Sequence, residues 1–170
     1  NKKTSCLLAF LDFEKAFDKL NWTLVQYTLE KFNLGENFSK WVRIIYTNVE
    51  SCIINNGVTS KYFPIKSGIR QGCPLSALLF IMAVEILAIG IRNNDGIHGI
   101  KVGNKIFKLT QLADDTTLFI RDTKGIDKIY KIFDKHYILL LYSNIYLYIN
   151  LITYREISYY LTIYMCLIYI

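Results

Sequence analysis

Cysteine and histidine are scarce in this chain of 170 residues, and neither residue type is clustered. The two histidines are isolated, and no pair of cysteines has the C-x-x-C spacing of a zinc site. This pattern excludes a zinc-binding module and a disulfide framework, and it predicts a reduced, intracellular protein, nuclear or cytoplasmic rather than secreted. The four cysteines are Cys6, Cys52, Cys73 and Cys166.

Charge is nearly absent from the last part of the chain. Residues 137–170 carry only Arg155 and Glu156 as charges, and 24 of these 34 residues are Tyr, Ile or Leu. Residues 1–136, in contrast, have the mixed composition of a globular domain. We therefore predict a boundary after residue 136, followed by an atypical Tyr/Ile/Leu-rich tail.

Three interpretations of the tail remain open. Tyr137–Tyr154 carries no charge, which is compatible with a membrane segment, but its tyrosines and polar residues argue against one. The tail is also compatible with an aggregation-prone β extension. We favour out-of-frame translation of AT-rich DNA, because Ile, Tyr, Leu and Asn are the residues that such DNA encodes.

Neither a Met nor a signal peptide precedes the first strand-like run, and we expect the chain to be a fragment. Its length suits one domain with its own hydrophobic core. The formal net charge of +6 favours a polyanionic partner such as nucleic acid.

Strand-like runs, helical runs and hairpin signals alternate along residues 1–136. This pattern predicts an α+β fold in which helices cover an antiparallel sheet. The expected elements are a strand over 5–13, a helix between an N-cap at Asn21 and a stop at Gly35, a helix over 37–49, a hairpin around Asn55-Asn56-Gly57, a buried helix from Pro74 to about Arg92, a turn at Gly103-Asn104, a hairpin with Asp114-Asp115 at its tip, and a helix over 124–137.

Three carboxylates interrupt this apolar pattern. Asp12 ends the first strand, and Asp114 and Asp115 lie side by side at a hairpin. One interpretation is that Asp12 caps a helix and the pair forms an ordinary turn. The other is a cation site, which requires the hairpin to pair beside the Asp12 strand. Three carboxylates at one sheet edge would then bind Mg²⁺, which prefers oxygen ligands and serves phosphoryl transfer.

Three motifs occur in a fixed order and decide between these interpretations. They are "FLDFEKAFD" (residues 10–18), "GIRQGCPLSALLF" (68–80) and "LADDTTLF" (112–119). Together they resemble the central palm motifs of reverse transcriptases, in particular those of the non-LTR (LINE-type) retrotransposon branch. The resemblance covers about residues 5–136 and implies a polymerase palm-like sheet, with part of the fingers and with the paired aspartates on a catalytic hairpin.

The resemblance implies roles for individual residues. Asp12, Asp114 and Asp115 match the catalytic, metal-binding aspartates, and the main-chain carbonyl of Phe13 would be a further metal ligand. Phe17 matches the aromatic gate under the sugar of the incoming nucleotide, where a ring would exclude a 2′-hydroxyl. The nucleotide-binding loop would contribute Arg70, Gln71 and Gly72.

The activity implied is RNA-directed DNA polymerisation, a two-metal transfer from a dNTP to a primer 3′-hydroxyl. Its cofactor would be Mg²⁺, and its partners would be an RNA template, a DNA primer and a dNTP. We infer no obligate protein partner and no membrane. Two alternatives stay open, a catalytically dead retroelement remnant that only binds nucleic acid, and a membrane-associated protein that uses the tail.

The chain departs from the family pattern at three places. Leu112 replaces the usual Phe or Tyr before A-D-D, and Ala77 replaces a proline; neither is a metal ligand. No lysine follows Lys135, where the family carries one that is thought to protonate the pyrophosphate leaving group. The expected thumb and the upstream finger motifs are missing as well.

Overall fold

The computed structural model describes residues 5–13, 15–137 and 145–153, which divide into two compact units. Unit 1 combines residues 5–13, 87–135 and 145–153, and unit 2 comprises residues 15–86 together with residues 136–137. Both contain helices and antiparallel strand pairs, so the predicted α+β class is confirmed. Much of the predicted tail, 138–144 and 154–170, lies outside the described residues, and the boundary after residue 136 stays a prediction.

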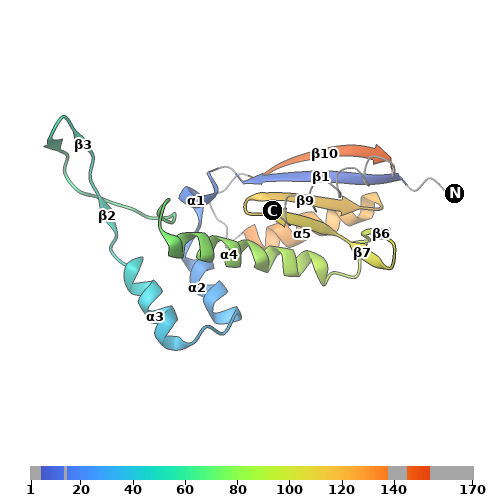
Figure 1. Cartoon of the computed structure of the whole chain (residues 1–170), viewed down its shortest axis with the longest axis horizontal. Coiled ribbons are helices and arrows are strands. Elements are labelled where there is room, and N and C mark those ends of the chain that lie inside the picture. The colour runs from blue at the N-terminus through green and yellow to red at the C-terminus, as the bar shows by residue number, and fades with distance from the viewer. Residues whose placement is uncertain (1–4, 14, 138–144, 154–170) are drawn as a thin grey trace. The chain divides into compact units, whose positions relative to one another are not determined.

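Unit 1 is built on a four-stranded antiparallel sheet in the order β10-β1-β9-β8 (Figure 1). A separate two-stranded ribbon, β6-β7, and the helix α5 accompany it. The elements are β1 (Ser5–Phe13), β6 (Ile100–Val102), β7 (Lys105–Phe107), β8 (Leu109–Leu112), β9 (Asp115–Ile120), α5 (Thr123–Tyr137) and β10 (Ile145–Thr153).

The β1 strand lies between two partners. It pairs with β9 from Leu7–Ile120 to Leu11–Thr116, and with β10 along all of its nine residues. The expected strand over 5–13 is therefore confirmed. Within the predicted tail, residues 145–153 form a regular strand of this sheet.

The core of unit 1 contains apolar side chains from β1, β6 and β9. Cys6, Leu8, Ile100 and Phe119 form a buried cluster, and Phe10, Val102 and Phe107 pack against it. Burial raises the pKa of the Cys6 thiol, because an apolar environment disfavours the thiolate. The β1 strand therefore joins the hydrogen bonds of the sheet to the packing of the core.

Unit 2 contains short helices and two small strand pairs. Its elements are α1 (Ala16–Lys19), α2 (Trp22–Lys31), α3 (Glu36–Ile45), β2 (Glu50–Ser51), β3 (Ile54–Asn55), β4 (Val58–Thr59), β5 (Phe63–Pro64) and the first part of α4 (Pro74–Arg92). The β3–β4 hairpin turns at Asn56-Gly57, as its sequence predicts. The expected helix from Pro74 to Arg92 is confirmed, and the helix over 37–49 is shorter than expected.

The α2 helix begins where the sequence predicts and ends earlier. The side chain of Asn21 caps it by accepting a hydrogen bond from the Thr23 N–H at 2.7 Å. The predicted stop at Gly35 is wrong. The helix ends at Lys31, and Asn33 adopts the left-handed conformation (φ 50°) of a Schellman motif, with a hydrogen bond from Leu34 N to Leu29 O. Gly35 instead precedes α3 as its N-cap.

The α4 helix is long and apolar enough, by length and composition alone, to cross a membrane. In the structure, 44% of the most apolar 18-residue stretch of this helix is buried. No other helix within the described residues passes that test. Core helices of soluble proteins pass it as well.

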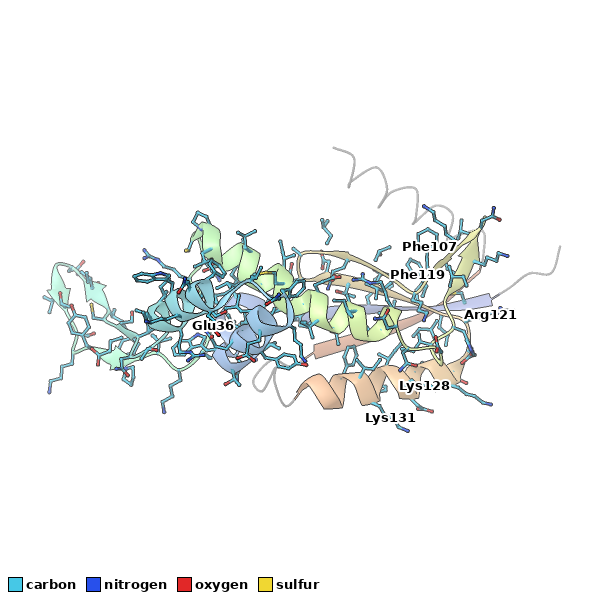
Figure 2. The ribbon with its side chains drawn as sticks, turned by 90° about the horizontal axis from the view of Figure 1, so that it is seen from below. Glu36, Phe107, Phe119, Arg121, Lys128 and Lys131 are labelled. Atoms are coloured by element: carbon cyan, nitrogen blue, oxygen red, sulfur yellow. The ribbon has the colours of Figure 1, made fainter. Side chains whose placement is uncertain are left out.

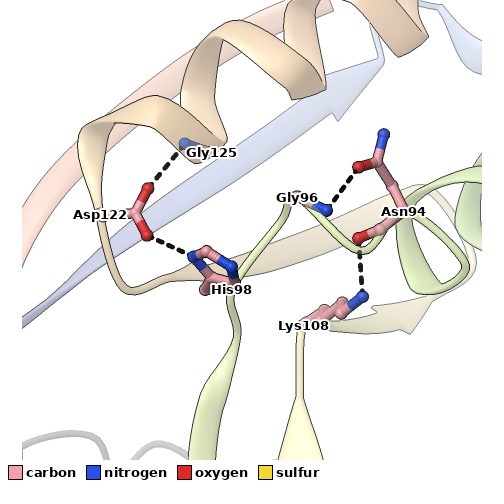
Figure 3. Close-up of polar contacts among 6 residues, drawn as sticks. All are labelled: Asn94, Gly96, His98, Lys108, Asp122 and Gly125. Atoms are coloured by element: carbon pink, nitrogen blue, oxygen red, sulfur yellow. Dashed lines mark hydrogen bonds and ion pairs between the residues drawn. The ribbon is translucent and has the colours of Figure 1, made fainter.

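A polar link ties the turn before β6 to the start of α5 (Figure 3). Asp122 receives a hydrogen bond from Gly125 N at 3.0 Å, and it forms an ion pair with His98 Nδ1 at 2.7 Å. Arg121 N also donates to the carbonyl of His98. The hydrogen bond from His98 is the main reason that the pKa of Asp122 lies below its ordinary value of 3.8.

We expect Leu8→Ala to lower the free energy of unfolding by about 2–5 kcal/mol, because the side chain is fully buried and its loss leaves a cavity. Leu112→Ala is the matched control in the same sheet. Its side chain is 45% exposed, and we expect a loss below about 1 kcal/mol. Urea denaturation measures both, and equal losses would contradict this description of the core.

We expect Asp122→Asn to lower the melting temperature near pH 6 and to have less effect as the pH falls below 3.8. A lowered carboxyl pKa stabilises the fold above the ordinary pKa, and that stabilisation is lost as the carboxylate is protonated. Asparagine still caps the helix, so the comparison isolates the charge. A difference of the same size at pH 2.5 and at pH 6 would contradict the assignment.

Candidate functional site

Asp12 occupies the second-last position of β1, between two buried residues. Leu11 and Phe13 are 2% and 5% exposed, whereas Asp12 is exposed. Successive side chains of a strand point to opposite faces, so Asp12 lies on the face opposite Leu11 and Phe13, the face that also carries the buried Leu8. Its position near the end of the strand leaves it exposed. The strand end thus presents a carboxylate without burying it.

A hairpin formed by β8 and β9 carries the other two aspartates. Leu112 pairs with Asp115, which leaves Ala113 and Asp114 as the two turn residues. The tip is therefore Ala113-Asp114, and the prediction of Asp114-Asp115 is displaced by one residue. Gln111 Nε2 donates to Thr116 Oγ1 at 2.9 Å across the hairpin and helps to hold this register.

Ala113 adopts a left-handed backbone conformation with φ of 53°. Two-residue hairpin loops favour positive φ at the first turn residue, usually with glycine there. Alanine in this conformation is strained, and such strain is characteristic of functional turns. The neighbouring strands impose the strain, and Asp114 follows directly after it.

The register of β1 and β9 brings the first aspartate beside the hairpin. Leu11 pairs with Thr116, and the next residues along the two strands are Asp12 and Asp115. The pairing of the hairpin beside the Asp12 strand is therefore observed. The expected set of three carboxylates lies at one end of the sheet, all exposed.

The chemistry of these carboxylates suits a divalent cation. None of the three side chains has a hydrogen-bond or ion-pair partner among the residues that the structure describes. Carboxylate oxygens are the ligands that Mg²⁺ prefers. However, across the described ranges no three Asp, Glu, His or Cys side chains converge closely enough to hold one metal ion.

In unit 2, Phe17 lies in α1 and its ring stacks on Phe80 of α4, with centroids 5.0 Å apart and an interplanar angle of 18°. The Phe17 carbonyl also accepts a hydrogen bond from Ile69 N at 2.7 Å. This places the predicted aromatic gate against the loop that precedes α4.

That loop, residues 67–72, is held against α1 and the start of α2 mainly through backbone atoms. Gly68 N donates to Leu20 O at 2.8 Å, and Trp22 Nε1 donates to Gly68 O at 2.7 Å. A β-carbon at Gly68 would lie 2.5 Å from the carbonyl oxygen of Asp18, so only glycine allows this approach. Sequence reasoning missed Gly68 and Trp22, because no spacing in the sequence shows which backbone groups meet.

The predicted nucleotide-binding residues of the loop are all exposed. Gln71 Nε2 lies 3.5 Å from Asp18 Oδ1, a long hydrogen bond that leaves the side chain free to turn. Gly72 has φ of 81°, which favours glycine there. Arg70 O accepts a hydrogen bond from Cys73 N, next to the start of α4. The structure therefore groups Phe17 with Gln71 through Asp18 and α1.

Cys73 ends the loop just before α4. Its thiol pKa is lowered, chiefly because the backbone N–H groups of Ser76 and Leu75 stabilise the thiolate. The backbone N–H groups in the first turn of this helix thus favour negative charge beside the Gln71-Gly72 loop.

Comparison with known proteins identifies the family of this chain. The family model described as reverse transcriptase (RNA-dependent DNA polymerase) matches residues 1–138. The chain is 33% identical, over 122 residues, to a retrovirus-related Pol polyprotein from the retrotransposable element R2DM of Drosophila melanogaster. It is 29% identical, over 129 residues, to a 149 kDa protein of transposon TX1 from Xenopus laevis.

These matches cover 72% and 75% of this chain but only 11% and 10% of the relatives' own lengths. A third relative, a Pol polyprotein from an R2 element of Popillia japonica, is 26% identical over 69% of this chain and 19% of its own length. The chain thus spans about a tenth of the length of the first two relatives. It belongs to the reverse transcriptase family, in its non-LTR retrotransposon branch.

Proposed function

We propose that this chain carries the palm of an RNA-directed DNA polymerase, which adds a nucleotide from a dNTP to a primer 3′-hydroxyl on an RNA template. The observation that supports this most strongly is the β1–β9 register, whose last pair, Leu11–Thr116, is followed along the two strands by Asp12 and Asp115. Family membership supplies the reaction class, and the exposed carboxylates supply the ligands.

Asp12, Asp114 and Asp115 would hold the divalent cations, with the main-chain carbonyl of Phe13 as a further donor. Bound Mg²⁺ would lower the pKa of the primer hydroxyl and stabilise the charge that develops on the leaving pyrophosphate. The chain's own part is to keep these oxygens without competing ion pairs, so that they remain free for metal. Water and the nucleotide's phosphates would complete the ligand set.

Phe17 would discriminate between the deoxyribose and the ribose of the incoming nucleotide. Its ring is held by Phe80 behind it and by the hydrogen bond from Ile69 N to its own carbonyl. A ring that cannot retreat would collide with a 2′-hydroxyl and admit a deoxyribose. Gln71 and Gly72 would lie against the base pair being formed, and Arg70 would contact a phosphate.

We expect Asp12→Asn and Asp114→Asn each to lower the rate of primer extension on an RNA template at least about 100-fold, because each removes a charged metal ligand. Asp95→Asn is the matched control. Asp95 is exposed and belongs to no part of the proposed site, so extension should stay unchanged. Chelation with EDTA should abolish extension, and added Mg²⁺ should restore it.

If the unaltered chain extends no primer with Mg²⁺ or Mn²⁺, the proposed activity is wrong for this chain, and nucleic-acid binding without turnover becomes its function. If the chain extends primers and Asp114→Asn extends them equally well, the site is wrong although the activity is correct.

We expect Phe17→Ala to raise ribonucleotide incorporation relative to deoxyribonucleotide incorporation by about 10- to 100-fold, since removing the ring makes room for the 2′-hydroxyl. The measured quantity is the ratio of kcat/KM for dNTP and rNTP, which a general loss of stability does not shift. Phe38→Ala truncates an exposed ring of the same unit and should leave the ratio unchanged. An unaltered ratio in Phe17→Ala would refute the gate.

A further inference from the structure

The outer face of α5 carries a row of cations that the polymerase site does not use. Arg121 precedes the helix, and Lys124, Lys128 and Lys131 follow at intervals of three, four and three residues. This is the spacing of one helical stripe. Figure 2 labels Arg121, Lys128 and Lys131 along this side of unit 1, and all four side chains are exposed. We call these four residues the basic stripe.

The opposite side of α5 fixes which way the stripe faces. Gly125, Ile129, Ile132 and Phe133 are buried, so the helix has one orientation on unit 1. The basic stripe lies on the exposed side of the helix, where the Lys128 side chain extends over Gly96. The stripe also begins at the far end of the sheet from the carboxylates. The β9 strand starts at Asp115 and ends at Ile120, and Arg121 follows directly. It is therefore a surface separate from the candidate metal site.

The charges of the stripe have no partner within the part of the chain that the structure describes. None of its four side chains forms an ion pair or a hydrogen bond with another described residue. The nearest acid in sequence, Asp122, is already engaged by His98 and by Gly125 N. Asp127, exposed beside the stripe, is the acid that remains on this part of the helix.

Unpaired cations in a row fit a polyanion with regular spacing. The three lysines span about 10 Å along a helix that rises 1.5 Å per residue, and Arg121 lies just before that helix. A nucleic-acid strand in a duplex carries one phosphate per about 3.4 Å of axis, so the length of the three lysines matches about three phosphates. An acidic protein partner would need carboxylates at the same regular spacing. A phosphodiester backbone carries regularly spaced negative charges along its whole length.

We propose that the basic stripe of α5 binds the phosphate backbone of a nucleic-acid strand, without reading its sequence, as a second contact outside the polymerase site. The choice of a nucleic acid as the partner is the only part of this inference that rests on the proposed function. Such a contact holds a template or a product near the enzyme while the carboxylates act at the other end of the sheet. Its strength should fall steeply with salt, because binding releases counterions from the phosphates.

The test is equilibrium binding of a fluorescein-labelled single-stranded RNA of mixed sequence to the full chain, by anisotropy at several salt concentrations. In K124Q/K128Q/K131Q, we expect the slope of log K against log salt to become shallower by about 2. Each of the three lost phosphate contacts should account for about 0.7 of this change. Affinity near 0.1 M salt should fall at least about tenfold. K124R/K128R/K131R keeps the charges and should bind as the unaltered chain does.

The matched control is K40Q/K61Q/K66Q, which removes the same charge from three exposed lysines of unit 2. It should change the slope by less than about 0.5. Asp127→Asn should strengthen RNA binding, since it removes the remaining acid beside the stripe. Circular dichroism confirms that each variant is folded.

Equal losses in the two triple variants would show a general charge effect and overturn the proposal. So would an unchanged slope in K124Q/K128Q/K131Q, or displacement of the RNA by polyglutamate at the same charge concentration. The proposed function fails separately. If the chain extends no primer but the salt slope changes in K124Q/K128Q/K131Q, the proposed function fails and this inference is supported. If the chain extends primers and the salt slope is unchanged in K124Q/K128Q/K131Q, this inference fails and the proposed function is unaffected.

Discussion

The antiparallel pairing of β1 with β9 is the interaction on which the rest of the candidate site depends. It runs alongside Leu8 and Leu11, which are buried on opposite faces of β1, and Asp12 is exposed near the strand end. Side chains alternate along a strand, so a slip of one residue would turn Asp12 to the face on which Leu11 and Phe13 are buried. Burying an unpaired charge is costly, and the core therefore favours the register in which Asp12 lies at the same end of the sheet as the hairpin aspartates.

The candidate residues are held by backbone geometry rather than by ion pairs. Ala113 accepts a left-handed conformation at a cost of about 1 kcal/mol, and this keeps Asp114 in a two-residue turn. In unit 2, the loop around Gly68 is held against α1 and the start of α2 by hydrogen bonds from main-chain and indole N–H groups. The three aspartates are exposed and form no hydrogen bond or ion pair with another described residue, which leaves their oxygens available to a metal ion.

Local signals in the sequence predicted the elements well, and contacts between distant segments could not be predicted. Asn21 caps a helix and Asn56-Gly57 turns a hairpin, because each acts on its immediate neighbours. The predicted stop at Gly35 was wrong since Asn33 took the left-handed position first. The aspartates could be singled out by their motifs, whereas Gly68 meets Asp18 across fifty residues, and no local pattern records that approach.

The central claim is that cation binding at the hairpin aspartates requires Asp12 on the neighbouring strand. Mn²⁺ titration followed by electron paramagnetic resonance, without nucleotide or nucleic acid, tests this claim independently of catalysis. The account predicts that the unaltered chain binds Mn²⁺ and that Asp12→Asn binds it at least about tenfold more weakly. Equal Mn²⁺ affinity in the two proteins would contradict the account, because the β1–β9 register would then have no part in holding the metal.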